Sequence, residues 1–423
     1  MTRPPPTPAD FEGLEGATIE LDIGPVAHGG HCVARTADGQ VVFVRHALPG
    51  EHVRAFVTEE RRGFLRADAI EVLVASPDRV VPPCPFAGPD RCGGCDFQHA
   101  DPSAQRDLKA AVVREQLVRL AGLTPAEVSD LGVRVAPLAG VPGQPEGLGW
   151  RTRVQYTVDS EGRAGLLKHR SHEVVPVDRC LIAHPRVQEA PVTGRSWPET
   201  DFVEVVAAGG GDLTVLGARG RGRPLPVSGP AKVREAAVGR EWTLPADAFW
   251  QVHPAAADTL AAAVVEQLDP RPAERAWDLY GGVGLFAAAL APRLGPAGRL
   301  TLVESDPKAA GAARRCLRDL TTVTVLESDV ERALANPRWR RVDLVVLDPP
   351  RAGAGRAVVE AILAREPRAV VYVACDPAAF ARDVRTFREA RWQLAKLRAY
   401  DLFPMTHHVE CVALLTPPLP ALI

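Results

Sequence analysis

Acidic and thiol side chains stand directly after apolar runs in the C-terminal part of the chain. Glu304 and Asp348 each end such a run, Cys375 ends another, and Pro349 and Pro350 stiffen the loop after Asp348. In an open parallel sheet these positions meet at one edge, where ligands bind. A cysteine there acts as a nucleophile when its thiolate is favoured. The placement predicts one ligand site with a candidate nucleophile. The alternative for Asp348 is an exposed acid at the end of a strand.

The glycine-rich segment DLYGGVGLF begins at the end of an earlier apolar run, RAWDL (275–279). Gly282 and Gly284 predict a turn that lets backbone approach a ligand at a helix N-terminus. The spacing also fits a dinucleotide-binding turn, and Glu304, twenty residues beyond Gly284, suits ribose hydroxyl groups in either interpretation. A tight turn that serves packing alone is the remaining interpretation.

Cys375 and Glu410 are the two candidates for chemistry at this edge. A cysteine in an apolar strand is usually an inert core residue. The place of Cys375 at the end of AVVYVAC, where Asp348 should share the crevice, favours a reactive role instead. Glu410 opens the apolar run VECVALLTP, and a buried carboxylate is costly unless it has a partner or a task. His407 and His408, just before it, also fit a solvated turn.

A second constellation consists of cysteines near the middle of the chain. Cys84, Cys92 and Cys95 have metal-ligand spacing, Gly93 and Gly94 let the backbone bend around a centre, and Cys180 is the candidate fourth ligand. The spacing fits a four-cysteine zinc site and an iron–sulfur cluster equally well. The remaining cysteines, Cys32, Cys316 and Cys411, are predicted to be packing residues.

The elements that must position these residues divide the chain into three expected domains. Short alternating runs separated by turn residues over 13–75 predict a small closed β-barrel, for which the oligonucleotide-binding kind is one option. Residues 76–245 hold the cysteines, a helix that begins at Asp101-Pro102, and a strand-rich part of unassigned topology. From 246 to 423, apolar runs alternate with helical segments, which predicts a doubly wound α/β domain with parallel strands and a final antiparallel pair.

Composition narrows the classes of protein. The N-terminus lacks an apolar signal segment and no apolar run is long enough to cross a bilayer, so we expect a cytoplasmic protein without membrane contact. The net charge of −2 means that contact with nucleic acid must come from local patches. Residues 13–75 carry six arginines against nine acids, so the barrel would have to bind RNA through one face.

With these residues assembled, the chain resembles the RNA uridine C5-methyltransferase family over nearly its whole length. FWQVH (249–253) resembles the family's F-x-Q-V-N, and DLYGGVGLF its S-adenosylmethionine turn. DPPRAG resembles D-P-P-R-x-G, VACDP resembles V-S-C-N-P around the nucleophile, and DLFPMTHHVE resembles the segment that carries the base. The N-terminal barrel, with ALPGE at 47–51, is similar to a TRAM domain.

The resemblance assigns roles residue by residue. It implies Cys375 as nucleophile and Glu410 as base, and a [4Fe–4S] cluster in preference to zinc on Cys84, Cys92, Cys95 and Cys180. It implies that the S-adenosylmethionine pocket is lined by Gln251, Tyr280, Glu304, Asp329 and Asp348.

The chain departs from the family pattern at several positions. Asp376 and His253 replace asparagines, Gly281 stands where cysteine is common, Leu285 stands where a polar residue is usual, and the first cysteine gap is longer. We expect Asp376, next to Cys375, to disfavour the thiolate.

The resemblance also indicates the class of RNA that the protein acts on. A TRAM-like barrel combined with cluster cysteines suggests 23S rRNA as substrate of a monomeric enzyme, with tRNA as the alternative. Rival interpretations are a catalytically inactive RNA-binding protein, a nicotinamide-dependent oxidoreductase with an iron–sulfur site, and a cytosine C5-methyltransferase. The DPPR and C-terminal motifs disfavour the oxidoreductase, and the presence of both Cys375 and Glu410 disfavours the inactive protein.

Overall fold

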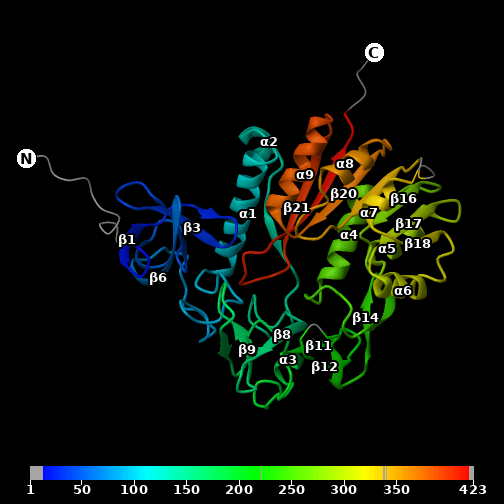
Figure 1. The fold of residues 1–423 in the computed structure, drawn as a ribbon. Helices are drawn as coiled ribbons and strands as arrows, with labels where there is room; N and C mark the ends of the chain where they lie inside the picture. Colours follow the sequence, from blue (N-terminus) through cyan, green and yellow to red (C-terminus); the bar gives the residue numbers. More distant parts are fainter. Residues whose placement is uncertain (1–12, 221, 337–338, 340, 419–423) are drawn as a thin grey trace, which may run out of the picture.

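The computed structural model describes residues 13–220, 222–336, 339 and 341–418. Figure 1 shows three parts: a small β-rich unit at the N-terminus, a strand-rich unit in the middle of the chain, and a large sheet flanked by helices. In the described part of the chain, no helix has the length and apolar character that a membrane span requires.

The N-terminal strands form a sheet around one core. Its order is β1-β5-β6-β4-β3-β2, with β1 (Thr18–Asp22), β2 (Val26–Ala27), β3 (His31–Arg35), β4 (Val41–Arg45), β5 (His52–Arg61) and β6 (Phe64–Val74). Beyond β1, the Ile23 N–H donates to the Glu51 carbonyl at 2.9 Å and the Gly24 N–H to the Val33 carbonyl at 2.8 Å. The segment that joins β1 to β2 therefore bonds to the start of β5 on one side and to β3 on the other, so that the sheet closes into the expected barrel. The sequence did not indicate β2 and β3, which are short and lie next to closely spaced glycines.

The middle of the chain forms an antiparallel sheet of order β10-β9-β8-β11-β12-β13. Its strands are β8 (Arg153–Val158), β9 (Ala164–Leu167), β10 (Val174–Pro176), β11 (Phe202–Ala207), β12 (Leu213–Ala218) and β13 (Leu225–Ser228). The short helix α3 (Pro185–Gln188) packs against β11, and a separate hairpin joins β14 (Lys232–Ala237) to β15 (Arg240–Pro245).

The helix expected after Asp101 is α1 (Pro102–Arg119). The Asp101 carboxylate accepts the Ser103 N–H at the N-terminus, and Pro102 occupies the first turn, where its missing N–H costs nothing. The side chains of Ala110, Val113 and Leu117 are buried. This helix packs against α9 (Pro377–Glu389) in the C-terminal unit. The strand that follows α2 (Pro125–Asp130), β7 (Val135–Pro137), pairs in parallel with β21 (Gln393–Asp401).

The large sheet has the order β18-β17-β16-β19-β20-β22-β21-β7. The five predicted parallel strands are present as β16 (Arg275–Leu279), β17 (Arg299–Glu304), β18 (Val323–Glu327), β19 (Leu344–Leu347) and β20 (Ala369–Ala374). The predicted antiparallel pair is also confirmed, as β21 (Gln393–Asp401) and β22 (Glu410–Thr416). The doubly wound sheet thus brings the carboxyl ends of β16, β17, β19 and β20 to one edge.

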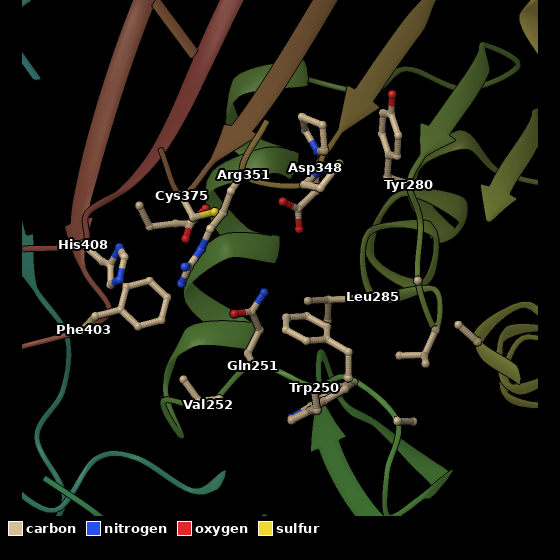
Figure 2. Close-up of a pocket in the computed structure, with 18 of the residues that line it drawn as sticks. Trp250, Gln251, Val252, Tyr280, Leu285, Asp348, Arg351, Cys375, Phe403 and His408 are labelled. Atoms are coloured by element: carbon tan, nitrogen blue, oxygen red, sulfur yellow. The ribbon is translucent and has the colours of Figure 1, made fainter. Parts of the chain in front are cut away.

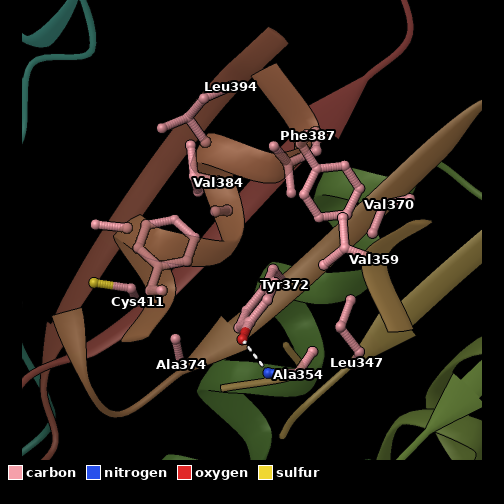
Figure 3. Close-up of a cluster of buried hydrophobic side chains, with 14 of the residues drawn as sticks. Leu347, Ala354, Val359, Val370, Tyr372, Ala374, Val384, Phe387, Leu394 and Cys411 are labelled. Atoms are coloured by element: carbon pink, nitrogen blue, oxygen red, sulfur yellow. Dashed lines mark hydrogen bonds between the residues drawn. The ribbon is translucent and has the colours of Figure 1, made fainter. Parts of the chain in front are cut away.

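Helices cover both faces of this sheet (Figure 1). One core cluster joins α4 (Ala256–Leu268), α5 (Leu285–Leu294) and α6 (Pro307–Cys316) to the strands. The other joins α1, α7 (Val330–Leu334), α8 (Arg356–Leu363) and α9 (Pro377–Glu389). In the second cluster the buried Tyr372 ring packs among aliphatic side chains, and its hydroxyl accepts the Ala354 N–H at 3.1 Å (Figure 3). That bond anchors the loop that follows Asp348-Pro-Pro-Arg351.

Candidate active site

A cavity of about 1040 Å³ opens at the carboxyl edge of the large sheet. Of the catalytic and cofactor residues expected from the sequence, Gln251, Tyr280, Glu304, Asp348, Cys375 and Glu410 all line it. Figure 2 shows the side chains of Gln251, Asp348 and Arg351 pointing into this cavity. Asp329 is not among its lining residues: it is exposed at the N-terminus of α7.

The glycine turn forms one wall of the cavity. The Glu304 carboxylate accepts the Gly282 N–H at 2.9 Å and the Asp306 N–H at 2.7 Å, which fixes its position at the end of β17. A Cβ on Gly281 would stand 2.5 Å from a Leu302 carbon, so the chain needs glycine here. The departure at Gly281 therefore has a steric reason in the large Leu302 side chain behind the turn.

Asp278 lies inside β16, behind the turn, and is fully buried. One carboxyl oxygen accepts the Ala287 N–H at 2.9 Å, and the other, Oδ1, has no hydrogen-bond partner among the described residues. Burial, with smaller contributions from Asp348 and Glu304, raises the pKa of Asp278 to about 8. Asp278 is not one of the residues that line the cavity, so its free oxygen is an unpaired buried polar atom behind the turn among the described residues.

Three titratable groups face one another where β19, β20 and β22 meet. Burial raises the pKa of Asp348 to about 7, and burial together with Asp348 raises the pKa of Glu410 well above its ordinary value. Burial, Glu410 and Asp348 raise the pKa of the Cys375 thiol to about 11, against the opposite effect of Arg351. The free protein therefore holds Cys375 as a thiol near neutral pH, and a cation in the cavity would favour ionisation of all three groups.

The Asp376 carboxylate, next to Cys375, is held by two other groups. Its Oδ1 accepts the Ala379 N–H at 2.8 Å at the N-terminus of α9, and its Oδ2 lies 3.1 Å from His28 Nε2. Burial alone would raise the pKa of Asp376, but these contacts outweigh it and lower the value to about 2. The acids that raise the Cys375 pKa are Glu410 and Asp348. Both oxygens of Asp376 thus have partners other than Cys375, and its expected effect on the thiolate stays a prediction.

The segment with Gln251 is held by the middle sheet. The Val252 carbonyl accepts hydrogen bonds from the Thr152 N–H at 2.8 Å and from its hydroxyl at 2.9 Å. The Arg153 guanidinium binds the carbonyls of Ala246 at 3.0 Å and Ala248 at 2.6 Å. Two adjacent residues of the middle sheet thereby fix the segment that presents Gln251 to the cavity.

The segment 402–409, which leads into Glu410, is held by the loop that carries the cysteines. The Met405 carbonyl accepts the N–H groups of Asp96 at 2.8 Å and Phe97 at 3.0 Å. The Asp96 carboxylate binds His407 Nδ1 at 2.7 Å, and its pKa is lowered to about 2 because this bond outweighs burial. The rings of His407 and His408 lie with their centroids 4.1 Å apart, so they form part of the cavity wall and not a solvated turn.

The four candidate metal ligands line one small cavity of about 40 Å³. Cys84, Cys92, Cys95 and Cys180 are all free thiols there, together with Gln98, whose amide donates to the Cys95 sulfur at 3.2 Å. Burial raises the pKa of Cys92, Cys95 and Cys180. Among the residues that the structure describes, no three His, Cys, Asp or Glu side chains form a group that could hold a metal ion. The fold thus gathers the four cysteines at one cavity.

Comparisons with known proteins agree with this architecture. Residues 13–70 match the TRAM domain family, 254–376 the methyltransferase small domain and 338–417 the tRNA (uracil-5-)-methyltransferase family. An uncharacterized RNA methyltransferase of Streptomyces avermitilis is 52% identical over 95% of this chain and 99% of its own length. The chain belongs to the RNA methyltransferase family.

More distant relatives extend the likeness. The 23S rRNA (uracil(1939)-C(5))-methyltransferase RlmD of Chromohalobacter salexigens is 33% identical over 94% of this chain and 89% of its own length. Among solved structures, the Pyrococcus abyssi tRNA (uracil-54, C5)-methyltransferase, in complex with S-adenosyl-L-homocysteine, has a TM-score of 0.68. It covers 94% of this chain and 100% of its own chain at 21% identity, which establishes a shared fold.

In this RNA methyltransferase a second cavity, of about 660 Å³, lies between the barrel and the turn after β9. Its barrel wall carries Arg45, Arg66 and the Phe43 ring, with the Arg66 guanidinium 5.9 Å from the centre of that ring. Arg170 contributes from the opposite side, and His169 lines both this cavity and the larger one. Glu59, Asp68, Asp90 and Glu173 also line this cavity, so its charge is mixed, and it adjoins the active-site cavity at His169.

The sequence did not identify several lining residues of the RNA methyltransferase. Phe249 lines the main cavity with 73% of its surface exposed, and Trp250 and Phe403 also line it. Each lies within one of the quoted motifs, and an aromatic residue next to a motif residue was the available signal. Asp96 carries no such signal, because it follows Cys95 directly within the cysteine loop.

Proposed function

We propose that this RNA methyltransferase transfers a methyl group from S-adenosylmethionine to C5 of a uridine in RNA. The observation that carries the proposal is that Cys375 and Glu410, from different strands, line one cavity together with Asp348 and the glycine turn. This reaction requires a thiol nucleophile and a carboxylate base close to a pocket that binds a nucleoside-containing cofactor.

The cofactor half of the cavity fits S-adenosylmethionine. The Glu304 carboxylate, held by two backbone N–H groups, suits ribose hydroxyl groups, and the free Oδ1 of Asp278 lies behind the same turn. Gln251, Tyr280 and Asp348 complete the proposed pocket. When bound, the cofactor supplies an electrophilic methyl group. Asp329, which is exposed at the start of α7 and does not line the cavity, is not part of the proposed pocket.

The proposed chemistry begins with ionisation of Cys375. Its sulfur adds to C6 of the uracil ring, which makes C5 nucleophilic. C5 then forms the new bond to the methyl carbon, whose bond to the sulfonium sulfur of the donor would break and leave S-adenosylhomocysteine. Glu410 then accepts the C5 proton, the sulfur–C6 bond breaks, and the thiolate is restored. Arg351, which favours the Cys375 thiolate electrostatically, lines the same cavity. The target base must leave its stack to reach these groups.

We propose 23S rRNA as the substrate and keep tRNA as the alternative. The relative from Chromohalobacter salexigens supports the first, and the family match at 338–417 keeps the second open. We further propose that RNA next to the target nucleotide follows the second cavity, where cations contact phosphates and Phe43 offers a stacking surface. On this proposal 13–75 is the barrel domain, 76–245 the central domain and 246–423 the catalytic domain.

We also propose a [4Fe–4S] cluster on Cys84, Cys92, Cys95 and Cys180. Around one zinc ion the sulfurs would stand about 3.8 Å apart, since each lies ~2.3 Å from the metal in a tetrahedron. In a four-iron cluster each thiolate binds a different iron, so the sulfurs are farther apart. Four free thiols around one cavity supply the four thiolate ligands that such a cluster takes, and this shared cavity supports the proposal.

The experiment is methyl transfer from labelled S-adenosylmethionine to unmodified 23S rRNA and to tRNA in parallel, with anaerobically purified protein. Nucleoside mass spectrometry should find 5-methyluridine in 23S rRNA, and Cys375→Ala should abolish both product and covalent RNA adduct. An adduct that persists in Cys375→Ala would refute the nucleophile. Binding of both ligands without product in either RNA would favour an inactive RNA-binding protein.

A further inference from the structure

One turn of the barrel reaches the catalytic domain beside the candidate nucleophile. The turn between β2 and β3 carries His28, whose Nε2 lies 3.1 Å from Asp376 Oδ2. The fit is close, because a Cβ on Gly30 would stand 2.8 Å from the His407 Cβ and 3.0 Å from the Asp96 Cβ. The His28–Asp376 contact therefore links two parts of the chain that are 348 residues apart.

Asp376 is a charged group at a sensitive place. It follows Cys375 directly, and its contacts with His28 and the α9 backbone lower its pKa to about 2 against the effect of burial. The N–H of Ala379 occupies Oδ1, and His28 occupies Oδ2, so both oxygens are held. Capping of α9 requires only Oδ1, and asparagine would serve there as well as aspartate. The second contact thus has a role other than the helix cap.

The thiol of Cys375 is already surrounded by acids. Glu410 and Asp348 face it from β22 and from the end of β19, and both raise its pKa, whereas Arg351 lowers it. A further carboxylate that turned toward the sulfur would suppress the thiolate more strongly, since like charges disfavour each other in a partly buried site. The hydrogen bond from the barrel holds the Asp376 carboxylate in another direction.

We propose that His28 is a positioning residue for the reaction, which holds the Asp376 carboxylate away from Cys375 and so keeps the thiolate accessible. A residue of the TRAM barrel thereby sets the reactivity of the nucleophile, and the barrel does more than contact RNA. The catalytic consequence rests on the proposed role of Cys375. The effect on the thiol itself does not, because it is measured without RNA or cofactor.

The test compares His28→Ala, Asp376→Asn and the double variant in the full-length protein. The rate of Cys375 alkylation by iodoacetamide is followed from pH 6 to 10 by peptide mass spectrometry. His28→Ala should slow alkylation at neutral pH by about three- to tenfold and move its pH profile upward. Adding Asp376→Asn should restore the wild-type rate, because the released side chain is then neutral. His52→Ala, which breaks the 2.8 Å His52–Asp22 contact elsewhere on the barrel, is the matched control.

A structural role would give a different pattern. If His28 only docks the barrel, the double variant still lacks the ion pair and should be as impaired as His28→Ala. Slow alkylation in both variants, or wild-type alkylation in His28→Ala, would overturn the proposal. Methyl transfer is measured on the same proteins: if Cys375→Ala retains activity, the proposed nucleophile fails while the alkylation result still decides the role of His28.

Discussion

The buried carboxyl groups of Glu410 and Asp348 raise the cost of ionising the Cys375 thiol, and Asp348 also raises the pKa of Glu410. The ionisation of the nucleophile, Cys375, and that of the base, Glu410, are therefore coupled before any ligand binds. Each group would ionise more readily only when the charge in the cavity changes. A cationic methyl donor is the kind of ligand that would make this change, because it favours the ionised carboxylates.

This linkage predicts opposite effects of Glu410→Gln on two measurements. Removing the carboxylate should lower the pKa of the Cys375 thiol from about 11 and so speed its alkylation at pH 7.5. Each pKa unit lost should increase the thiolate population, and with it the alkylation rate, by about tenfold. Methyl transfer should fall by about a hundredfold or more, since no group accepts the C5 proton. The RNA adduct should accumulate in a denaturing gel. Slower alkylation in Glu410→Gln would contradict the electrostatic account.

The buried acids also predict how stability depends on pH. The pKa of Asp278 rises from 3.8 unfolded to about 8 in the folded protein. Between these values the folded state binds more protons than the unfolded state, so this group makes the free energy of unfolding fall as pH rises. Asp278→Asn keeps an oxygen for the Ala287 N–H and should remove this dependence.

The measurement for Asp278 is urea denaturation of both proteins from pH 5 to 9. The stability difference between variant and wild type should grow in favour of the variant as pH increases. Buried histidines such as His408, whose pKa is lowered to about 3 by burial, act with the opposite sign and at lower pH. They cancel in the difference. A difference that is independent of pH would refute the high pKa of Asp278.

A buried ion pair positions the start of the segment 402–409. Lys109 Nζ on α1 donates to Asp401 Oδ1 at 2.5 Å and to the Phe403 carbonyl at 3.0 Å. Lys109→Met leaves the buried Asp401 without its partner, which should cost about 3–5 kcal/mol of unfolding free energy. Adding Asp401→Leu should recover much of the loss, because the unpaired charge is then absent. Arg119→Ala, which breaks an exposed pair with Glu115 on the same helix, should cost below about 1 kcal/mol.

The large sheet could be predicted from the sequence because its buried parallel strands are continuous apolar runs. The runs at β16, β19 and β20 are typical of buried parallel strands. The residues after them lie together because the carboxyl ends of parallel strands meet at one edge of the sheet. The middle sheet could not be assigned in the same way. Its strands β9, β10 and β13 are short, and β13 is exposed along its length, so no alternation marks them.

Contacts between distant segments were also beyond sequence reasoning. The sequence places Asp376 next to Cys375 and suggests repulsion, whereas the fold supplies His28 from the barrel. Similarly, Asp96 stands in a cysteine loop, and only the fold brings it to His407. Side-chain direction depends on partners that lie hundreds of residues away. Placement on an element was therefore predictable, and the electrostatic environment was not.

The cysteine loop and the base-carrying segment should respond together to loss of the proposed cluster. Anaerobic protein should contain about four irons per chain, and Cys180→Ala should contain fewer. Because Asp96 and Phe97 adjoin Cys95 and hold the Met405 carbonyl, cluster loss should loosen residues 402–409 and impair RNA methylation more than S-adenosylmethionine binding. Hydrogen exchange at 402–409 should rise in Cys180→Ala and remain unchanged in Cys316→Ala, which removes a free cysteine outside the site.

Asp96→Asn should reproduce part of this loosening with a full iron content, since it weakens the bond to His407 without touching a ligand. Unchanged exchange after complete iron loss would mean that the loop, and not a cluster, positions Glu410.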